Sequence, residues 1–500
     1  MIPNAAQTLA LVKEALGTPN TSTDGMNPLQ KSITQALGLV QYDLQAPALS
    51  LFPVLTPLRN EIPRVAGAGG TATNWKAVTA INTGKTSGVV SEGNRGAAVT
   101  TQVQTYLASY AGLGLEDFVS FEADYASQGF QDVKATAQLN LLRAVMLQEE
   151  PMLLGGNTSM ALGTTPTPTL STATGTANGS IGAAIVASVI CVALTQDGVY
   201  RSTIAGGLPV GPVSKTNTDG SVDSFGPGVA QKSASNTVTT GAGSANTVTA
   251  TVAPVNGAMG YAWYVGTAGS ERLAAITTIN SVVLLAIPGA SQLASALPSS
   301  DQSVNALGFD GLLTLAAKPG SNGYTASLAT GTPGTGVGLT SDGAGGIVEF
   351  TTAFQSFWNN YRLSPDTVWV SGQELVNISK KIIANGGAPL LRITQDATAE
   401  HSEVTGGVRI KAILNPITQT MVALRVHPNI TAGTVLFTTR EVPYPLPGVG
   451  NLCQVKTRKE YYSLEWPLRS RKYEYGVYCD EVLQHYAPFT MGVINNIGNA

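Results

Sequence analysis

The sequence contains few cysteines and few charged residues. Its three cysteines are Cys191, Cys453 and Cys479, and an odd, sparse set does not form the disulfide framework that stabilises small secreted domains. Charged residues make up only 12% of the 500 residues, and the formal net charge is −3. A chain so close to neutrality is not a dedicated polyanion-binding protein.

Long hydrophobic runs are also missing. The most apolar run, residues 181–194, is about 14 residues long and too short to span a bilayer. Because it is rich in valine and isoleucine, we predict a buried strand. Residues 1–17 lack a basic region ahead of their apolar part, so we expect no signal peptide. Together with the few cysteines, this predicts a soluble protein made in a cytoplasm.

Motifs for catalysis, cofactors or metals are absent. Residues 84–86 (Gly-Lys-Thr) resemble the end of a phosphate-binding loop, but Thr79 stands where that motif requires glycine. The glycine-rich residues 334–338 have the wrong spacing for a dinucleotide site. The three histidines fit no zinc-binding pattern: they are His401, His427 and His485. We therefore predict no catalytic residue, no cofactor site and no metal site.

Two weaker candidates for chemistry remain. Cys479 and His485 could form a nucleophile and base pair, but nothing marks a third member, and structural roles are favoured. An acidic cluster could bind a cation, although a solvated or partner-facing surface is the favoured interpretation. The cluster consists of Glu116, Asp117, Glu122 and Asp124.

Residues 116–156 carry the clearest secondary-structure signal. Residues 116–123 alternate in the manner of a strand. From about residue 131 the period becomes helical, and residues 135–150 are good helix formers without glycine or proline. We expect Pro151 and the following Gly155-Gly156 pair to end a helix about 30 Å long. The residues predicted to share one face are Val133, Ala137, Leu141 and Val145, with Leu142 and Met146 beside it.

The N-terminal part reads as an arm followed by a ribbon. A helix is predicted at residues 28–40, after which four prolines favour an extended segment: Pro47, Pro53, Pro57 and Pro63. This segment lies either on a neighbouring subunit or on its own. Strands at residues 74–81 and 97–110 would form a ribbon that is marginal alone and needs another molecule to lie on. Its exposed polar face is predicted to contain Thr100, Gln102, Gln104 and Tyr106.

The rest of the chain divides by composition. Residues 157–296 are rich in Thr, Ser, Gly, Ala and Val. Their alternating runs, with Trp263 in mid-strand, predict a β-sandwich; the runs are 183–189, 248–252, 261–265 and 276–287. We predict a helix at 346–361, with Phe350, Phe354 and Phe357 on one side, and another at 373–385, ended by Gly386-Gly387. Strands are predicted at 366–370, 407–413, 421–426 and 434–438. The charged residues 453–494 form either a two-faced strand pair at a sheet edge or longer strands inside a domain.

The order of these elements resembles the major capsid protein of tailed bacteriophages, of the Hong Kong 97 type. The resemblance is carried by the strand and long helix at 116–156, by LGFDGLLTLA at 307–316 and by SPDTVWVSGQE at 364–374. It implies an α+β fold with an inserted all-β sandwich similar to immunoglobulin or fibronectin type III modules. The implied parts are an N-terminal arm (1–64), an extended loop ribbon (65–122), a peripheral domain with a spine helix (123–160), the inserted sandwich (161–298), an axial domain (299–450), and peripheral-domain strands with the C-terminus (451–500).

The function implied by this resemblance is assembly. Such a protein forms hexamers and pentamers that build the icosahedral head of a tailed phage and enclose double-stranded DNA without reading its sequence. The resemblance implies a virion protein and not an enzyme. It implies assembly in the host bacterial cytoplasm, without a membrane. The implied partners are a separate scaffold protein, a portal and cement or decoration proteins. The family can cross-link through lysine and asparagine, and Lys76 and Lys85 lie in the loop, but no asparagine partner can be assigned.

Two other interpretations stay open. A surface adhesin or S-layer protein would explain the module rich in threonine, serine and glycine. A hydrolase with an accessory β-module would explain the mixture of α/β and β segments. The expected lack of a signal peptide counts against the first, and the missing catalytic constellation counts against the second.

Overall fold

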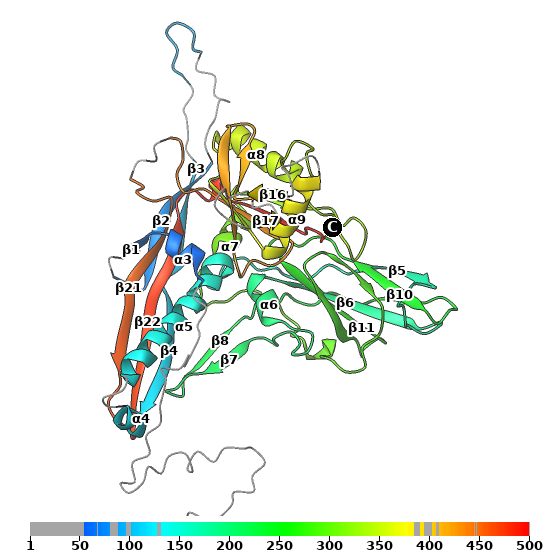
Figure 1. Cartoon of the computed structure of the whole chain (residues 1–500), viewed down its shortest axis with the longest axis horizontal. Coiled ribbons are helices and arrows are strands. Elements are labelled where there is room, and N and C mark those ends of the chain that lie inside the picture. The colour runs from blue at the N-terminus through cyan, green and yellow to red at the C-terminus, as the bar shows by residue number, and fades with distance from the viewer. Residues whose placement is uncertain are drawn as a thin grey trace, which may run out of the picture. The chain divides into compact units, whose positions relative to one another are not determined.

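Figure 1 shows a computed structural model of the chain. It separates into two units, Met1–Pro53 and Val54–Ala500, and only the second is described here. The described residues are 55–67, 69–80, 89–96, 102–127, 132–384, 391–394, 403–406, 410–444, 446 and 448–499. The predicted helix at 28–40, the loop tip at 84–86, His401 and Gly386-Gly387 therefore lie outside the described residues.

A four-stranded sheet contains the charged C-terminal strands. Its order is β1-β21-β22-β4, with β1 parallel to β21 and the other neighbours antiparallel. The strand pair predicted at 453–494 is confirmed, and it occupies the middle of the sheet, not its edge. The bounds are β1 Arg64–Ala66, β21 Cys453–Glu465, β22 Lys472–His485 and β4 Ala111–Ser120.

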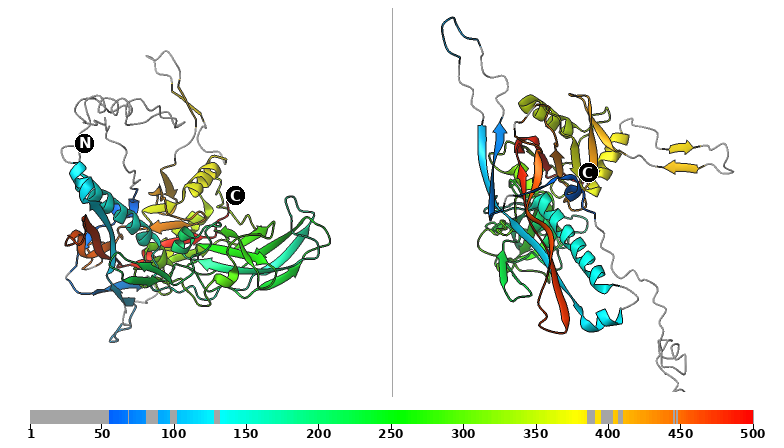
Figure 2. Two further views of the ribbon diagram at one scale, coloured as in Figure 1. Left: turned by 90° about the horizontal axis from the view of Figure 1, so that it is seen from below. Right: turned by 90° about the vertical axis from the view of Figure 1, so that its left-hand side faces the viewer.

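One face of this sheet is covered by the long helix α5 (Val133–Gly155) (Figure 2). Leu141 and Val145 are buried against Val119 of β4 and Tyr475 of β22. Val133, Ala137 and Leu142 pack around them, so the helical face predicted from sequence is confirmed. Asp132 caps the helix by accepting a hydrogen bond from the Ala135 N–H at 2.9 Å.

Two predictions about the boundaries of this region are wrong. The strand ends at Ser120, whose hydroxyl accepts from the Ala123 N–H and starts the short helix α4 (Phe121–Ala126). Pro151 does not end α5, although a proline inside a helix costs about 3 kcal/mol. The last turn continues because Leu153 and Leu154 are fully buried in the core, and the helix stops only at Gly156.

The predicted ribbon is present as β2 (Ala72–Ala80) paired antiparallel with β3 (Gln102–Ser109). Its predicted polar face is wrong in one respect, because Tyr106 is buried and stacks on Trp75 with ring centroids 5.7 Å apart. The Trp75 indole donates to the carbonyl of His485 at 3.1 Å. The outward face of β3 instead exposes Leu107, whose side chain is 75% exposed. Gln102 and Gln104 are exposed as predicted, and Thr100 is outside the described residues.

Two sheets face each other across a shared core in the Thr/Ser/Gly-rich part of the chain. Side chains from both sheets surround Trp263, which is fully buried and donates to Thr277 Oγ1 at 2.8 Å. The predicted run at 276–287 is two strands, because the chain turns at residues 278–280. One sheet contains β5 Thr169–Thr174, β10 Asn246–Thr251 and β13 Ser281–Leu284; the other contains β6 Val186–Leu194, β9 Asn236–Thr239, β11 Gly260–Gly266 and β12 Arg272–Thr277.

This core gives a stability prediction. We expect Trp263→Ala to lower the local unfolding free energy of β6 and β11 by about 3–5 kcal/mol, because a large buried ring is removed. Native-state hydrogen exchange on the whole chain measures this locally. The control residue Val222 lies in the hairpin of β7 (Val213–Thr216) and β8 (Val222–Phe225) and is 61% exposed. Val222→Ala should therefore change the local unfolding free energy of β6 and β11 by no more than about 0.5 kcal/mol. Equal effects of the two substitutions would contradict the assignment of Trp263 to the core.

A six-stranded mixed sheet forms the third part of the described chain. Helix α8 (Val348–Tyr361) places Phe350, Phe354 and Phe357 against Phe437 of this sheet, as its spacing predicted. Helix α9 (Gly372–Ala384) follows directly after β15. The sheet order is β14-β23-β20-β15-β19-β18, with bounds β14 Tyr324–Ser327, β23 Gly492–Asn495, β20 Val435–Thr438, β15 Thr367–Val370, β19 Thr420–Val426 and β18 Ala412–Asn415.

Two features of this sheet differ from expectation. Of the strand predicted at 407–413, residues 407–409 lie outside the described residues, and the observed strand β18 begins only at Ala412. A separate antiparallel pair, β16 (Leu391–Thr394) and β17 (Glu403–Gly406), precedes it in the chain. The C-terminal strand β23 inserts between β14 and β20, although residues 451–500 were expected to belong to the first sheet. Ile494 is fully buried there, so the chain end completes the core beneath α8.

Candidate functional site

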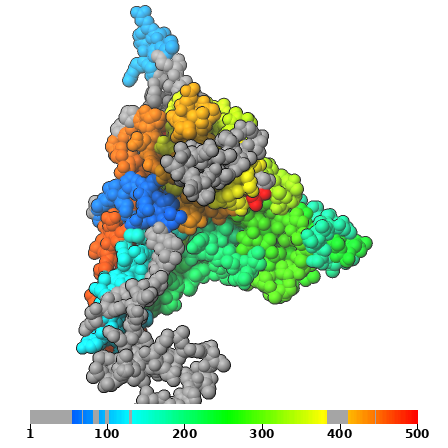
Figure 3. Space-filling model, in the orientation of Figure 1, coloured from blue at the N-terminus to red at the C-terminus, as the bar shows by residue number. Residues whose placement is uncertain are grey.

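The densest set of buried charges lies where residues 57–66 meet the C-terminal half of α5. We call this place the junction; it comprises residues 57–66 with Glu149, Glu150, His427, Tyr461 and Glu481. Its first element is the helix α3 (Pro57–Glu61), so the segment predicted to be extended contains one helical turn. Proline suits the first position of a helix, where no intrahelical partner for an N–H exists. Figure 3 shows this segment in blue at the surface, between strands in orange and α5 in cyan.

Glu150 binds the start of α3. Its carboxylate accepts from the backbone N–H groups of Leu58 at 2.8 Å and Arg59 at 2.9 Å. A third bond, of 2.7 Å, joins it to Nε2 of His427. Because His427 Nδ1 accepts from the Asn429 N–H, Nε2 carries the proton and donates. Glu150 is 1% exposed, and its three donors satisfy a charge that burial would otherwise make costly.

Glu149 binds the side chains of the same segment. It forms ion pairs with Arg59 at 3.3 Å and Arg64 at 2.5 Å, and it accepts a short hydrogen bond from the Tyr461 hydroxyl. Arg64 reaches across to Glu481 of β22 at 2.6 Å. One arginine thus bridges two buried carboxylates, from the helix and from the sheet. The guanidinium groups of Arg59 and Arg64 also lie over the ring of Tyr461, 5.1 and 4.9 Å from its centre.

The charges in the junction shift one another's pKa. Burial and the charge of Glu149 together raise the pKa of Glu481 to about 7, although Arg64 opposes them. Its Oε1 is buried without a hydrogen-bond partner among the described residues, which also disfavours the charged form. Burial lowers the pKa of Arg64, but the charges of Glu149 and Glu481 outweigh it and raise the pKa overall. Arg64 therefore stays charged throughout the physiological range.

Glu481 should make stability depend on pH. Its folded-state pKa of about 7 exceeds an unfolded value of about 4.3, so the folded state holds the proton more tightly. Its contribution is fully present below the unfolded pKa and is lost as pH rises through about 7. We expect the thermal midpoint of Glu481→Gln to rise relative to that of the original chain between about pH 5 and about pH 8. Glu460, which contacts the same Arg64 but is 61% exposed, provides the control Glu460→Gln, with no such trend. If the difference in thermal midpoint between Glu481→Gln and the original chain does not change with pH, the raised pKa of Glu481 is contradicted.

The proposed nucleophile and base pair does not form. Cys479 and His485 are six residues apart on β22, about 20 Å along a strand. The Cys479 thiol contacts Arg64 and Glu481, and burial raises its pKa, the opposite of activation. Burial lowers the pKa of His485 to about 3, and its Nδ1 accepts from the Ala487 N–H. Both side chains are therefore structural.

The acidic cluster is used in separate contacts and does not converge. Asp124 pairs with Lys134 at 3.2 Å, Glu122 pairs with Arg471 at 2.7 Å, and Glu116 accepts from the Tyr478 hydroxyl. Within the described residues, no group of three or more His, Cys, Asp or Glu side chains is placed to hold a metal. No helix in that part of the chain is long and apolar enough to cross a membrane.

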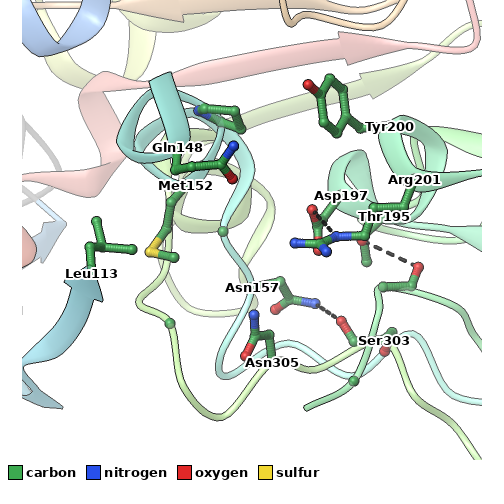
Figure 4. Close-up of a pocket in the computed structure, with 15 residues that line it drawn as sticks. Leu113, Gln148, Met152, Asn157, Thr195, Asp197, Tyr200, Arg201, Ser303 and Asn305 are labelled. Carbon is green, nitrogen blue, oxygen red and sulfur yellow. Dashed lines mark hydrogen bonds and ion pairs between the residues drawn. The ribbon is translucent and has the colours of Figure 1, made fainter. Parts of the chain in front are cut away.

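A small cavity of about 100 Å³ lies between the end of α5, β4 and the helix α6 (Gln196–Arg201) (Figure 4). This volume holds about three water molecules. Its charged residues, Asp197 and Arg201, pair with each other at 2.8 Å. Burial raises the pKa of Asp197, and Arg201 partly reverses this. Its other polar residues include Asn157, which donates to the carbonyl of Ser303 at 3.0 Å. Polar groups that bond to one another in so small a space indicate a structural cavity.

The described part of the chain thus carries a buried charged junction and an exposed ribbon in place of a reaction centre. The architecture is similar to that of solved shell proteins. The cyanophage A-1(L) capsid aligns with a TM-score of 0.42 and 9% identity, covering 94% of this chain and 99% of that chain. The capsid of a native GTA particle aligns with a TM-score of 0.39 and 7% identity, covering 92% and 96%.

The encapsulin complex from Synechococcus elongatus PCC 7942 gives a TM-score of 0.37 and 8% identity, covering 92% of this chain and 94% of that chain. No protein-family model and no curated protein matches the sequence. Because these TM-scores lie below 0.5, we base the functional proposal on the chain's own elements.

Sequence reasoning missed the junction. From sequence, Glu149 and Glu150 are predicted only to belong to a helix, and Arg64 is predicted only to end an arm. The available signal was the pair of adjacent acids in a helical stretch otherwise dominated by apolar residues, because buried carboxylates need partners. Nothing local identifies those partners, since Glu150 and His427 are 277 residues apart.

Proposed function

We propose that this chain is a major capsid protein of the Hong Kong 97 type, whose copies assemble into the icosahedral head of a tailed phage around double-stranded DNA. The observation that supports this best is the ribbon β2–β3. One face packs on its own chain through Trp75 and Tyr106, while the other exposes Leu107 and Val103. A two-stranded ribbon with an open apolar face is marginal alone and suits a surface that a neighbouring copy covers.

The other parts fit this proposal. Helix α5 serves as the spine of the peripheral domain, with the four-stranded sheet beside it, and the six-stranded sheet with α8 and α9 forms the axial domain. The facing sheets around Trp263 form an inserted immunoglobulin-like module within residues 161–298. The junction joins these parts, because Glu150 binds α3 and His427 while Arg64 binds α5 and β22. It anchors residues 57–66 to the long helix and to the sheet.

The charge supports enclosure of DNA without sequence recognition. A net charge of −3 gives no strong attraction for phosphate, and specific recognition would need a basic surface aimed at a groove. We propose hexamers and pentamers of this chain as its main contacts, with a separate scaffold protein, a portal and cement proteins as partners. The role is structural, and assembly takes place in a bacterial cytoplasm.

Sedimentation velocity tests the proposal. We expect hexamers or larger species at micromolar concentration, because the open ribbon face is buried only between copies. Arg469→Ala, at an exposed turn between β21 and β22, serves as a surface control that leaves the distribution unchanged. A single monomer boundary at every concentration, with and without a scaffold protein, would refute the proposal.

A further inference from the structure

The loop between the two strands of the ribbon carries an exposed apolar pair. Val89 is 90% exposed and Val90 is 42% exposed. They belong to the described loop 89–96, which projects away from the rest of the described chain (Figures 1 and 3). Glu92 and Arg95 follow in the same loop and are exposed, and neither forms an ion pair within the described residues. Two adjacent exposed valines flanked by both charge signs suit insertion into a pocket with an apolar floor and a charged rim.

The same chain contains a pocket of that kind beside the junction. It has a volume of about 220 Å³. Its floor is apolar and consists of Leu58, Ile62, Leu312, Trp369 and Met491. Its rim carries Glu61 and Arg440, which pair with each other, and Glu441. Cys453 lines one wall. Glu441 is exposed and forms no ion pair among the described residues.

We infer that Val89 and Val90 of one copy seat in this pocket of a second copy. The inference rests on the proposed shell function and names the surface that receives the ribbon. The pocket is large enough for the side chains of two valines. Its rim matches the loop in charge at Glu441, which can pair with Arg95.

The junction shapes this pocket. Leu58 forms part of the floor, and its backbone N–H is held by Glu150 at 2.8 Å. Trp369, also part of the floor, donates its indole N–H to Thr438 Oγ1 at 3.1 Å. Both floor residues are therefore held by hydrogen bonds, and the pocket is preorganised for an incoming apolar group.

Cysteine cross-linking tests the inference with the whole chain. The variants Val89→Cys and Val90→Cys are each assembled, with a scaffold protein if one is needed. They are then oxidised to join the new cysteine to Cys453 of a second copy. Copper–phenanthroline is the oxidant, because burial raises the pKa of Cys453 to about 12 and makes its thiol slow to react. We expect a ladder of disulfide-linked chains on a non-reducing gel. Adding Cys453→Ser should abolish the ladder. Leu107→Cys, which is 75% exposed on the ribbon's face, should give none through Cys453.

The outcomes separate this inference from the shell function. Regular shells without a Cys453 cross-link at either loop position would overturn the docking site and leave the shell function standing. If the cysteine variants do not assemble, the rate of maleimide labelling of Cys453 in the unsubstituted chain tests whether assembly covers the pocket. Assembly should slow that labelling at least tenfold, and equal rates in subunits and shells would overturn the inference. Failure of the unsubstituted chain to form any shell would overturn both proposals.

Discussion

We expect Arg64→Ala to lower the free energy of unfolding by about 3–5 kcal/mol. Arg64 holds two carboxylates that are almost fully buried, Glu149 at 2.5 Å and Glu481 at 2.6 Å. Removing the guanidinium takes the shared partner away from two buried carboxyl groups, and neither can be resolvated without opening the core. Urea denaturation of the unassembled subunit, followed by tyrosine and tryptophan fluorescence, measures the change.

The control uses the outer partner of the same arginine. Glu460 contacts Arg64 at 3.2 Å but is 61% exposed, so Glu460→Ala should cost no more than about 0.5 kcal/mol. The double substitution Arg64→Ala with Glu481→Gln should recover part of the loss, because one buried charge is removed along with its partner. A small effect of Arg64→Ala, equal to that of Glu460→Ala, would show that the junction does not stabilise the subunit.

Replacing residues 80–97 with a short Gly-Ser turn should leave a folded subunit that no longer forms regular shells. The base of the ribbon keeps its anchors, since Trp75 still donates to His485 and the Val78 N–H still donates to the carbonyl of Tyr486 at 2.8 Å. Shortening a surface loop changes the closure entropy little. Assembly fails because Val89 and Val90, the exposed apolar pair that a neighbour covers, are lost. Thermal unfolding and particle formation are measured on one preparation.

A second loop of the chain provides the matched control. Residues 217–221 join β7 to β8 in a turn in which the Asn217 N–H donates to the carbonyl of Ser221 at 2.8 Å. The same Gly-Ser replacement there should permit shells. Normal shells from the ribbon variant would refute the role of the ribbon. A ribbon variant that does not fold would place residues 80–97 in a core, which favours an ordinary α+β enzyme.

The elements that could be predicted from sequence are those set by local pattern. The face of α5 follows from the spacing of Val133, Ala137, Leu141 and Val145, because a helix repeats every 3.6 residues whatever lies elsewhere in the chain. The phenylalanines of α8 and the alternation around Trp263 have the same property. Each of these signals also lies in a stretch whose residues favour the observed structure, so local preference and packing agree.

The features that were missed depend on distant contacts. Pro151 continues α5 because Leu153 and Leu154 pack against Leu312 and Leu313, contacts that no local propensity contains. Tyr106 shares its face of the strand with the exposed Gln102 and Gln104 but is buried, because Trp75 lies opposite it across the ribbon.

The same limitation applies to the junction and to the chain end. Arg64 and Glu481 are 417 residues apart, and β23 reaches β14 and β20 from the end of the chain. Buried charges in a helix show that partners exist, but only the folded chain shows which residues they are.

The central claim is that copies of this chain build a closed shell. Negative-stain electron microscopy of the purified chain, alone and coexpressed with a candidate scaffold protein, tests it most directly. The account predicts closed particles of regular size with icosahedral outlines. A field of uniform single subunits under every condition, from protein that unfolds cooperatively and is therefore correctly folded, would contradict it.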